Sequence, residues 1–262
     1  MPSPVAPARP DPAVDAFVAV YAALVDDAER ARIALAHRLD RLTRTDEWGR
    51  GIPAEHPEMQ ILSAQLEANA AHEAGLIAQL QRAVDRHPLG AWQRSVVGVG
   101  AKQLGRLLGC IGNPYWHGPE DRPRTVDQLR AYCGYSVVGG QAQRLRAGVQ
   151  ANWNGAARKR AYLIAESCIK QARSPYRPVY DAARVRYAGV IVRDEPISDG
   201  HAHLRALRAV AKELLLDLWR EARARTLAGD YVLRQRARRT EPPMTHPSDR
   251  LALTEAQHNA AA

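Results

Sequence analysis

Two glycines and two cations stand close together near the middle of the chain, in a pattern that can hold a phosphate. Gly98-Val99-Gly100 forms a tight turn, and the amphipathic helical pattern that follows it carries Lys102 and Arg106 on one face. Glycine lets backbone N–H groups approach a ligand closely, and a helix N-terminus favours anions. The pattern predicts a helix-hairpin-helix that grips a nucleic-acid phosphate. A plain turn between packed helices is the alternative.

Further cations follow this turn and extend the predicted binding surface. Arg144 and Arg146 lie in a glycine-rich stretch, residues 134–148, and Arg158-Lys159-Arg160 lies near the start of a predicted helix. We predict that all five add phosphate contacts. Trp153 offers an aromatic face beside these cations, which suits single-stranded nucleic acid, although a buried tryptophan is the commoner case.

The charge distribution points to the same region. The chain of 262 residues has 37 Lys and Arg against 28 Asp and Glu, a net charge of +9. Residues 1–100 sum to −3, residues 101–190 to +10 and residues 191–262 to +2. A basic excess confined to one segment favours a polyanion partner, DNA or structured RNA. A membrane is not expected as the partner, because the sequence has no apolar run of the length that a membrane span needs.

Other chemical groups give weaker signals. Cys110, Cys133 and Cys168 are widely spaced, so we expect neither disulfides nor a zinc site, and no motif indicates a cofactor. His201 and His203 follow three acidic residues, a spacing that permits a cation site but is better explained by helix capping. Without a signal-peptide pattern, we expect a reduced, cytoplasmic, nucleoid-associated protein.

The elements that position these residues are predicted to be mainly α-helical. Residues 11–44 and 57–86 have apolar residues at three- and four-residue spacing, so we expect a long antiparallel, coiled-coil-like hairpin, or stalk, over residues 11–88. Residues 89–228 are predicted to form a helical domain containing the helix-hairpin-helix, with helices over 125–133, 154–173, 179–187 and 200–227. Residues 115–124 read as a polar loop, and residues 134–148 as an irregular or short hairpin segment. Residues 1–10 and 229–262 are predicted to be a proline-rich and a basic disordered tail.

The order of features from His87 to Arg223 resembles the C-terminal domain of the RNA-bridge-guided insertion-sequence transposases of bacteria, which pair a RuvC-like DEDD domain with a serine-bearing domain. Four segments carry the resemblance: Val97 to Leu108, Thr125 to Tyr135, Asn154 to Glu166, and Ala206 to Trp219. The resemblance implies a helical stalk before the glycine turn, as the periodicity also indicates, and a role in DNA transposition and recombination.

Two departures from the family pattern bear on catalysis. The RNase-H-like domain with its four metal-binding carboxylates would precede the stalk, and we expect no such metal site in this chain. The family's nucleophilic serine would fall near Gly140 or Ala142, neither of which is a serine. Ser136 is the only hydroxyl candidate nearby, and serines in such loops are more often turn formers.

These observations lead to one hypothesis and two alternatives. The first is a DNA-binding, transposase-like protein that is truncated or domesticated and does not cut DNA alone. The second is the catalytic half of a split recombinase whose RNase-H-like domain is supplied in trans. The third is a coiled-coil scaffold that binds no nucleic acid. The stalk is predicted to join a second copy or another partner chain, and packing of its two helices within the chain alone is the alternative.

Overall fold

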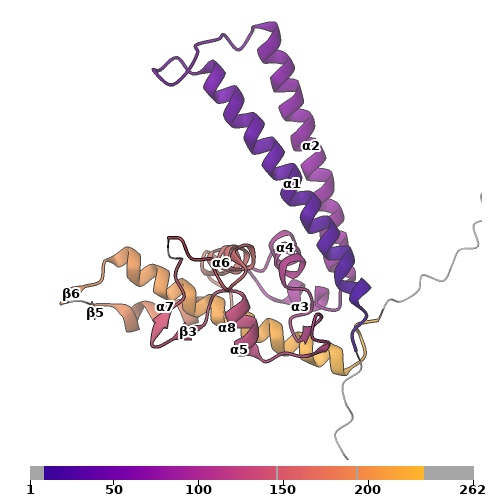
Figure 1. Cartoon of the computed structure of the whole chain (residues 1–262), viewed down its shortest axis with the longest axis vertical. Coiled ribbons are helices and arrows are strands. Elements are labelled where there is room, and N and C mark those ends of the chain that lie inside the picture. Colours follow the sequence, from indigo (N-terminus) through magenta and orange to yellow (C-terminus); the bar gives the residue numbers. More distant parts are fainter. Residues whose placement is uncertain (1–8, 146, 193, 233–262) are drawn as a thin grey trace, which may run out of the picture. The chain divides into compact units, whose positions relative to one another are not determined.

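The computed structural model describes residues 9–145, 147–192 and 194–232, and this part of the chain is mainly helical, as predicted (Figure 1). The helices are α1 (Pro12–Thr43), α2 (Pro57–Arg86), α3 (Gly90–Ser95), α4 (Ala101–Ile111), α5 (Val126–Tyr132), α6 (Gly155–Ile169), α7 (Arg177–Tyr187) and α8 (Asp199–Leu227). Short antiparallel ladders pair β1 (Trp116–His117) with β2 (Arg122–Pro123), β3 (Val137–Val138) with β4 (Gln141–Ala142), and β5 (Ile191–Val192) with β6 (Glu195–Pro196).

Helices α1 and α2 run antiparallel and pack along each other. Asp15 near the start of α1 accepts a hydrogen bond from His87, just past the end of α2, at 3.0 Å. Further along, Arg32 of α1 donates to Glu73 of α2 at 2.6 Å. Val18, Ala22 and Val25 of α1 are buried in the same hydrophobic cluster as Leu80 and Val84 of α2, so apolar contacts stabilise this pair of helices.

Helix α4 connects this pair of helices to the rest of the described chain. A Cβ added at Gly105 would lie 2.7 Å from Leu80 of α2, and one at Gly109 would lie 2.6 Å from Ala22 of α1. Both distances are shorter than real Cβ contacts, so the two glycines allow α4 to approach the hairpin closely. The helix that the glycine turn introduces is therefore the one that packs against both hairpin helices.

Among the described residues, one hydrophobic core cluster extends through the hairpin and the helices that follow it. The predicted boundary between residues 88 and 89 does not divide two cores, because buried residues on both sides of it belong to one cluster. This cluster includes Val25, Leu80, Val84, Leu104, Leu107, Leu108, Ile164, Leu214 and Leu215.

Local sequence signals explain where several helices begin. The Thr125 hydroxyl accepts from the Gln128 backbone at 3.2 Å while the Gln128 side chain accepts from the Thr125 backbone at 2.9 Å, which is the predicted capping box. Asn154 caps α6 by accepting from Ala157 N at 2.9 Å.

Several predicted boundaries need correction. The helix predicted over 154–173 ends at Ile169, and the predicted polar loop at 115–124 contains the β1–β2 ladder. The basic tail was expected to begin at residue 229, but Tyr231 is buried and its carbonyl accepts from Asp11 N at 2.8 Å. Residues 1–8 and 233–262 of the two predicted tails lie outside the described residues.

Candidate nucleic-acid interface

The glycine turn is shaped by helix packing. Gly98 has φ +97°, a conformation that L side chains rarely adopt, and a Cβ there would lie 2.6 Å from the Cα of Cys168 in α6. Val99 is buried, and its carbonyl accepts from the Gln93 side chain at 2.6 Å. Gly100 is exposed at the N-cap of α4. Contact with α6 is therefore enough to account for the glycine at position 98.

The two cations that follow the turn face the hairpin. The Arg106 side chain is 2% exposed and its guanidinium forms ion pairs with Asp26 and Glu29 of α1. Lys102 Nζ lies 3.4 Å from Glu73 Oε1 and 3.8 Å from Glu29 Oε1. These side chains therefore bind protein carboxylates where a phosphate contact had been predicted.

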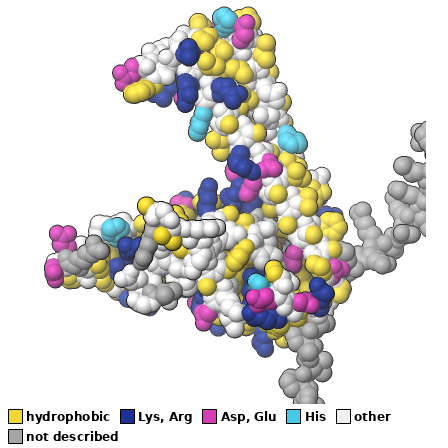
Figure 2. Space-filling model, in the orientation of Figure 1, with side chains coloured by type: hydrophobic (Ala, Val, Ile, Leu, Met, Phe, Trp, Pro, Cys, Tyr) yellow, Lys and Arg dark blue, Asp and Glu magenta, His cyan; other side chains and the backbone are white. Residues whose placement is uncertain are grey.

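Arg160 of α6 reaches one of these carboxylates, since its Nη2 lies 3.0 Å from Asp26 Oδ1. We call this group the hairpin-root cluster, and basic and acidic side chains adjoin where the hairpin meets α4 (Figure 2). It consists of Asp26, Glu29, Arg32, Glu73, Lys102, Arg106 and Arg160. Arg106 and Arg160 are buried here, which corrects their predicted role as phosphate contacts.

The pKa values in the hairpin-root cluster show that its charges stabilise one another. The hydrogen bond from Arg106 lowers the pKa of Glu29 below its ordinary value, against a smaller opposing effect of burial. Burial opposes ionisation of Glu73, but hydrogen bonds from Arg32 and Lys102 outweigh it and lower the pKa of that carboxyl as well. The carboxylates therefore stay ionised and neutralise the cations around them.

A second group of cations lies where α5, α6 and α8 meet the β3–β4 segment, and it is built differently. Arg208 Nη2 donates to the Ser136 carbonyl at 2.8 Å, and Arg158 Nη1 donates to the Gln143 carbonyl at 3.3 Å. Arg130 Nη2 donates to the Lys212 carbonyl at 3.0 Å. We call Arg130, Arg158, Arg208 and Lys212 the α6–α8 cation cluster.

Carboxylates contribute little to the α6–α8 cation cluster. Within the described ranges, no ion pair joins Arg158, Arg208 or Lys212 to a carboxylate, and Arg130 lies 3.5 Å from the exposed Asp127. Main-chain carbonyls orient these side chains but carry no net negative charge. Arg158, Arg208 and Lys212 therefore lack carboxylate partners among the described residues, in contrast to the cations of the hairpin-root cluster.

The pKa shifts record this crowding of like charges. Burial lowers the pKa of Lys212, and the neighbouring Arg208 and Arg130 lower it further. Burial likewise lowers the pKa of Arg208, with an added contribution from Arg158. Because each of these cations disfavours the charged form of its neighbours, an anion bound among them would be stabilised.

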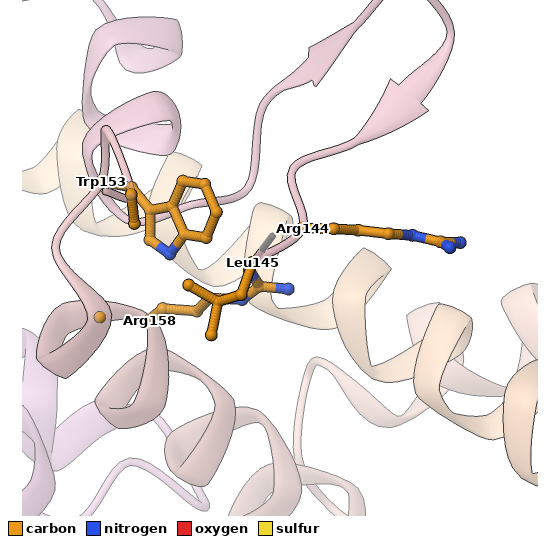
Figure 3. A pocket seen from close by; sticks show the side chains of 6 residues that line it. Arg144, Leu145, Trp153 and Arg158 are labelled. Carbon is orange, nitrogen blue, oxygen red and sulfur yellow. The ribbon is translucent and has the colours of Figure 1, made fainter. Parts of the chain in front are cut away.

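Aromatic rings are interleaved with these cations. The Arg208 Cζ lies 5.2 Å from the ring centroid of Tyr135, and the Arg158 Cζ lies 5.6 Å from that of Trp153. Trp153 and Arg158 also line a cavity of about 390 Å³ together with Arg144, Leu145, Ala151 and Gly155 (Figure 3). Tyr135 is buried, so the partly exposed Trp153 is the ring of this pair that can meet a ligand. A cation beside an accessible aromatic face is typical of surfaces that bind single-stranded nucleic acid.

The remaining residues that the sequence singled out belong to neither cluster. Lys159 and Arg144 are exposed, and Arg146 lies outside the described residues. Ser136 contributes its carbonyl to Arg208, and among the residues that the structure describes no hydrogen bond joins its hydroxyl to a histidine or a carboxylate. His203 bonds to the Tyr180 hydroxyl at 2.7 Å.

Sequence reasoning missed Arg130, Arg208 and Lys212 as members of this surface. The signal was present in α8, where Arg208 and Lys212 are four residues apart and therefore share a face beside the apolar stripe. The charge count does not distinguish this segment, because acids offset its cations and residues 191–262 sum to only +2.

No protein-family model, curated protein or solved structure matches this chain. Across the described part of the chain, no helix is long and apolar enough to cross a membrane. The same residues contain no group of three or more His, Cys, Asp or Glu side chains that could hold a metal ion.

Proposed function

We propose that this chain binds nucleic acid, and DNA in particular, through the α6–α8 cation cluster, as a transposase-like protein linked to DNA recombination. The observation that carries the proposal is the gathering of Arg158, Arg208 and Lys212 beside Tyr135 and Trp153 without carboxylate partners among the described residues. Such a cluster attracts phosphates, and the basic excess of residues 101–190 lies around it. The ordered resemblance to the serine-bearing transposase domain adds support for DNA as the polyanion.

The glycine turn has a reduced part in this proposal. The hairpin-root cluster neutralises Lys102 and Arg106, so the exposed N-cap residue Gly100 only supplements the α6–α8 surface. Arg144 and Lys159 are exposed beside that surface and keep the phosphate-contact role that the sequence predicted. Cleavage is not proposed, since Ser136 has no base that the described structure places beside it.

The test is the salt dependence of binding to duplex and single-stranded DNA. We expect Arg158 and Lys212 each to contact one phosphate. The double change Arg158→Gln with Lys212→Gln should then make the slope of log K against log salt less steep by about 2 for duplex DNA. This change corresponds to an affinity loss of up to about 60-fold at 0.1 M salt. Arg30→Gln is the matched control, because Arg30 is exposed on α1 and pairs with Asp27. A slope that is equally steep in the double variant would refute the proposed surface.

A scaffold function is the second candidate, and one observation favours it. Phe17 and Val20 are each 57% exposed, and their three-residue spacing places them on one face of α1. An apolar face of this kind suits packing against another chain. A protein that forms a tight oligomer but shows no polyanion affinity at low salt would favour the scaffold over DNA binding.

A further inference from the structure

The cavity beside the α6–α8 cation cluster has the lining of a ligand site. Trp153, Leu145 and Ala151 give it a mostly apolar wall, and Arg158 lies at its edge (Figure 3). Leu145 is 77% exposed at this cavity. Apolar walls with a few placed charges are typical of pockets that take a flat, partly apolar ligand.

The indole is held in place before any ligand arrives. A Cβ at Gly134 would lie 2.7 Å from Trp153 Cδ1, so glycine at that position leaves room for the ring. The next residue, Asn154, is tied to α5, because its backbone N donates to the Tyr132 carbonyl at 2.7 Å and its side chain to the Tyr132 hydroxyl at 2.9 Å. The aromatic surface is therefore positioned by the junction of α5 and α6, which reduces the entropy lost on stacking.

The cations around the ring are arranged for a backbone that passes the cavity. The Arg158 guanidinium lies over the indole at 5.6 Å, whereas the Arg144 side chain extends away from it (Figure 3). Positive charge is thus available at more than one point around the apolar wall. A nucleotide has the matching chemistry, since its flat base is flanked by two phosphates.

We propose that the Trp153 cavity binds one unpaired nucleobase, which stacks on the indole while Arg158 and Arg144 contact the neighbouring phosphates. This inference rests on the proposed nucleic-acid binding and names the form of nucleic acid that the surface prefers. A base inside a duplex is paired and stacked on its neighbours, so it must be unpaired or extruded to reach the ring. The site therefore discriminates single strands from duplexes.

The experiment compares Trp153→Ala and Trp153→Phe with the unchanged protein at one salt concentration. The probes are oligothymidylate, oligouridylate and a DNA duplex of equal length, with inorganic polyphosphate as a polyanion that has no bases. Loss of one stacking contact lowers the affinity for the single strands by about 5- to 150-fold in Trp153→Ala, and Trp153→Phe recovers most of it. Affinities for the duplex and for polyphosphate change less than about twofold, since the charges are intact.

The outcomes separate this inference from the function on which it rests. If the unchanged protein binds duplex DNA with a steep salt dependence and Trp153→Ala binds all four probes as the unchanged protein does, the base site is wrong and the proposed function stands. A parallel loss for polyphosphate would also overturn the base site, because no base is involved. If the unchanged protein binds none of the probes, both proposals fail.

Far-ultraviolet circular dichroism and Trp116→Phe, a change at another tryptophan, control for loss of fold. The two homopolymers show whether DNA or RNA supplies the base.

Discussion

Replacing Arg106 by glutamine decides whether this cation holds the fold together or holds a phosphate. Breaking a fully buried ion pair by removing one partner costs about 3 to 5 kcal/mol. Here the side chains of Asp26 and Glu29 are 31% and 27% exposed, so water partly solvates them once Arg106 is gone. Asp26 also keeps its ion pair with Arg160. We therefore expect Arg106→Gln to lower the free energy of unfolding by about 2 to 3 kcal/mol.

Urea unfolding followed by circular dichroism measures this loss. Arg30→Gln is again the control, because it removes the same charge from an exposed position on α1, where Arg30 is 77% exposed and its pair with Asp27 contributes at most about 0.5 kcal/mol. The salt slope for DNA binding should not change in Arg106→Gln, since the buried guanidinium cannot reach a phosphate. A stability loss below about 1 kcal/mol together with a slope reduced by about 1 would show that the hairpin-root reasoning is wrong and that the original phosphate prediction was right.

Two further predictions concern the same junction. Glu29 and Glu73 have pKa values lowered by folding, so the stability that they confer is present above their ordinary pKa of 4.5 and is lost as the pH falls through their lower folded pKa values. Urea unfolding midpoints measured from pH 7 downward should therefore fall below pH 5. The fall should be less steep in Arg106→Gln. Gly98→Ala should destabilise the protein by about 2 to 4 kcal/mol because it forces a positive φ and a Cβ against Cys168, whereas Gly100→Ala, with open space and φ −77°, should cost less than about 1 kcal/mol. Equal midpoints for the two glycine variants would contradict the packing account of the turn.

Much of the helical framework could be predicted from the sequence because its signals are local. The second hairpin helix was predicted from Pro57 to Arg86 and has those bounds, since a proline at N1 and an unbroken apolar stripe define it. The capping box at Thr125 and the N-cap at Asn154 were also predictable, because a side chain and the amide that it caps are within three residues. Signals of this range do not depend on the rest of the fold.

The partner that each cation binds could not be predicted, because the paired residues are distant from each other in the chain. Arg106 and Asp26 are 80 residues apart, and Arg160 and Asp26 are 134 residues apart. A charge count over residues 101–190 treats these arginines as available to an outside anion, although acids of the acidic first segment neutralise them. The cavity posed the same difficulty, since residues 145, 153 and 158 line one space only after the β3–β4 segment folds back toward α6.

The acids of the hairpin also determine where a polyanion can bind. Asp26, Glu29 and Glu73 concentrate negative charge at the start of α4, so a phosphate that approached Gly100 would have to compete with carboxylates already bound to Lys102 and Arg106. No such competitor is paired with Arg158, Arg208 or Lys212 in the part of the chain that the structure describes. The cations of the hairpin-root cluster thus join α4 and α6 to the hairpin, while those of the α6–α8 cation cluster stay available beside Trp153. Because α6 carries Arg160 into the first set and Arg158 into the second, this helix connects the hairpin to the proposed binding surface.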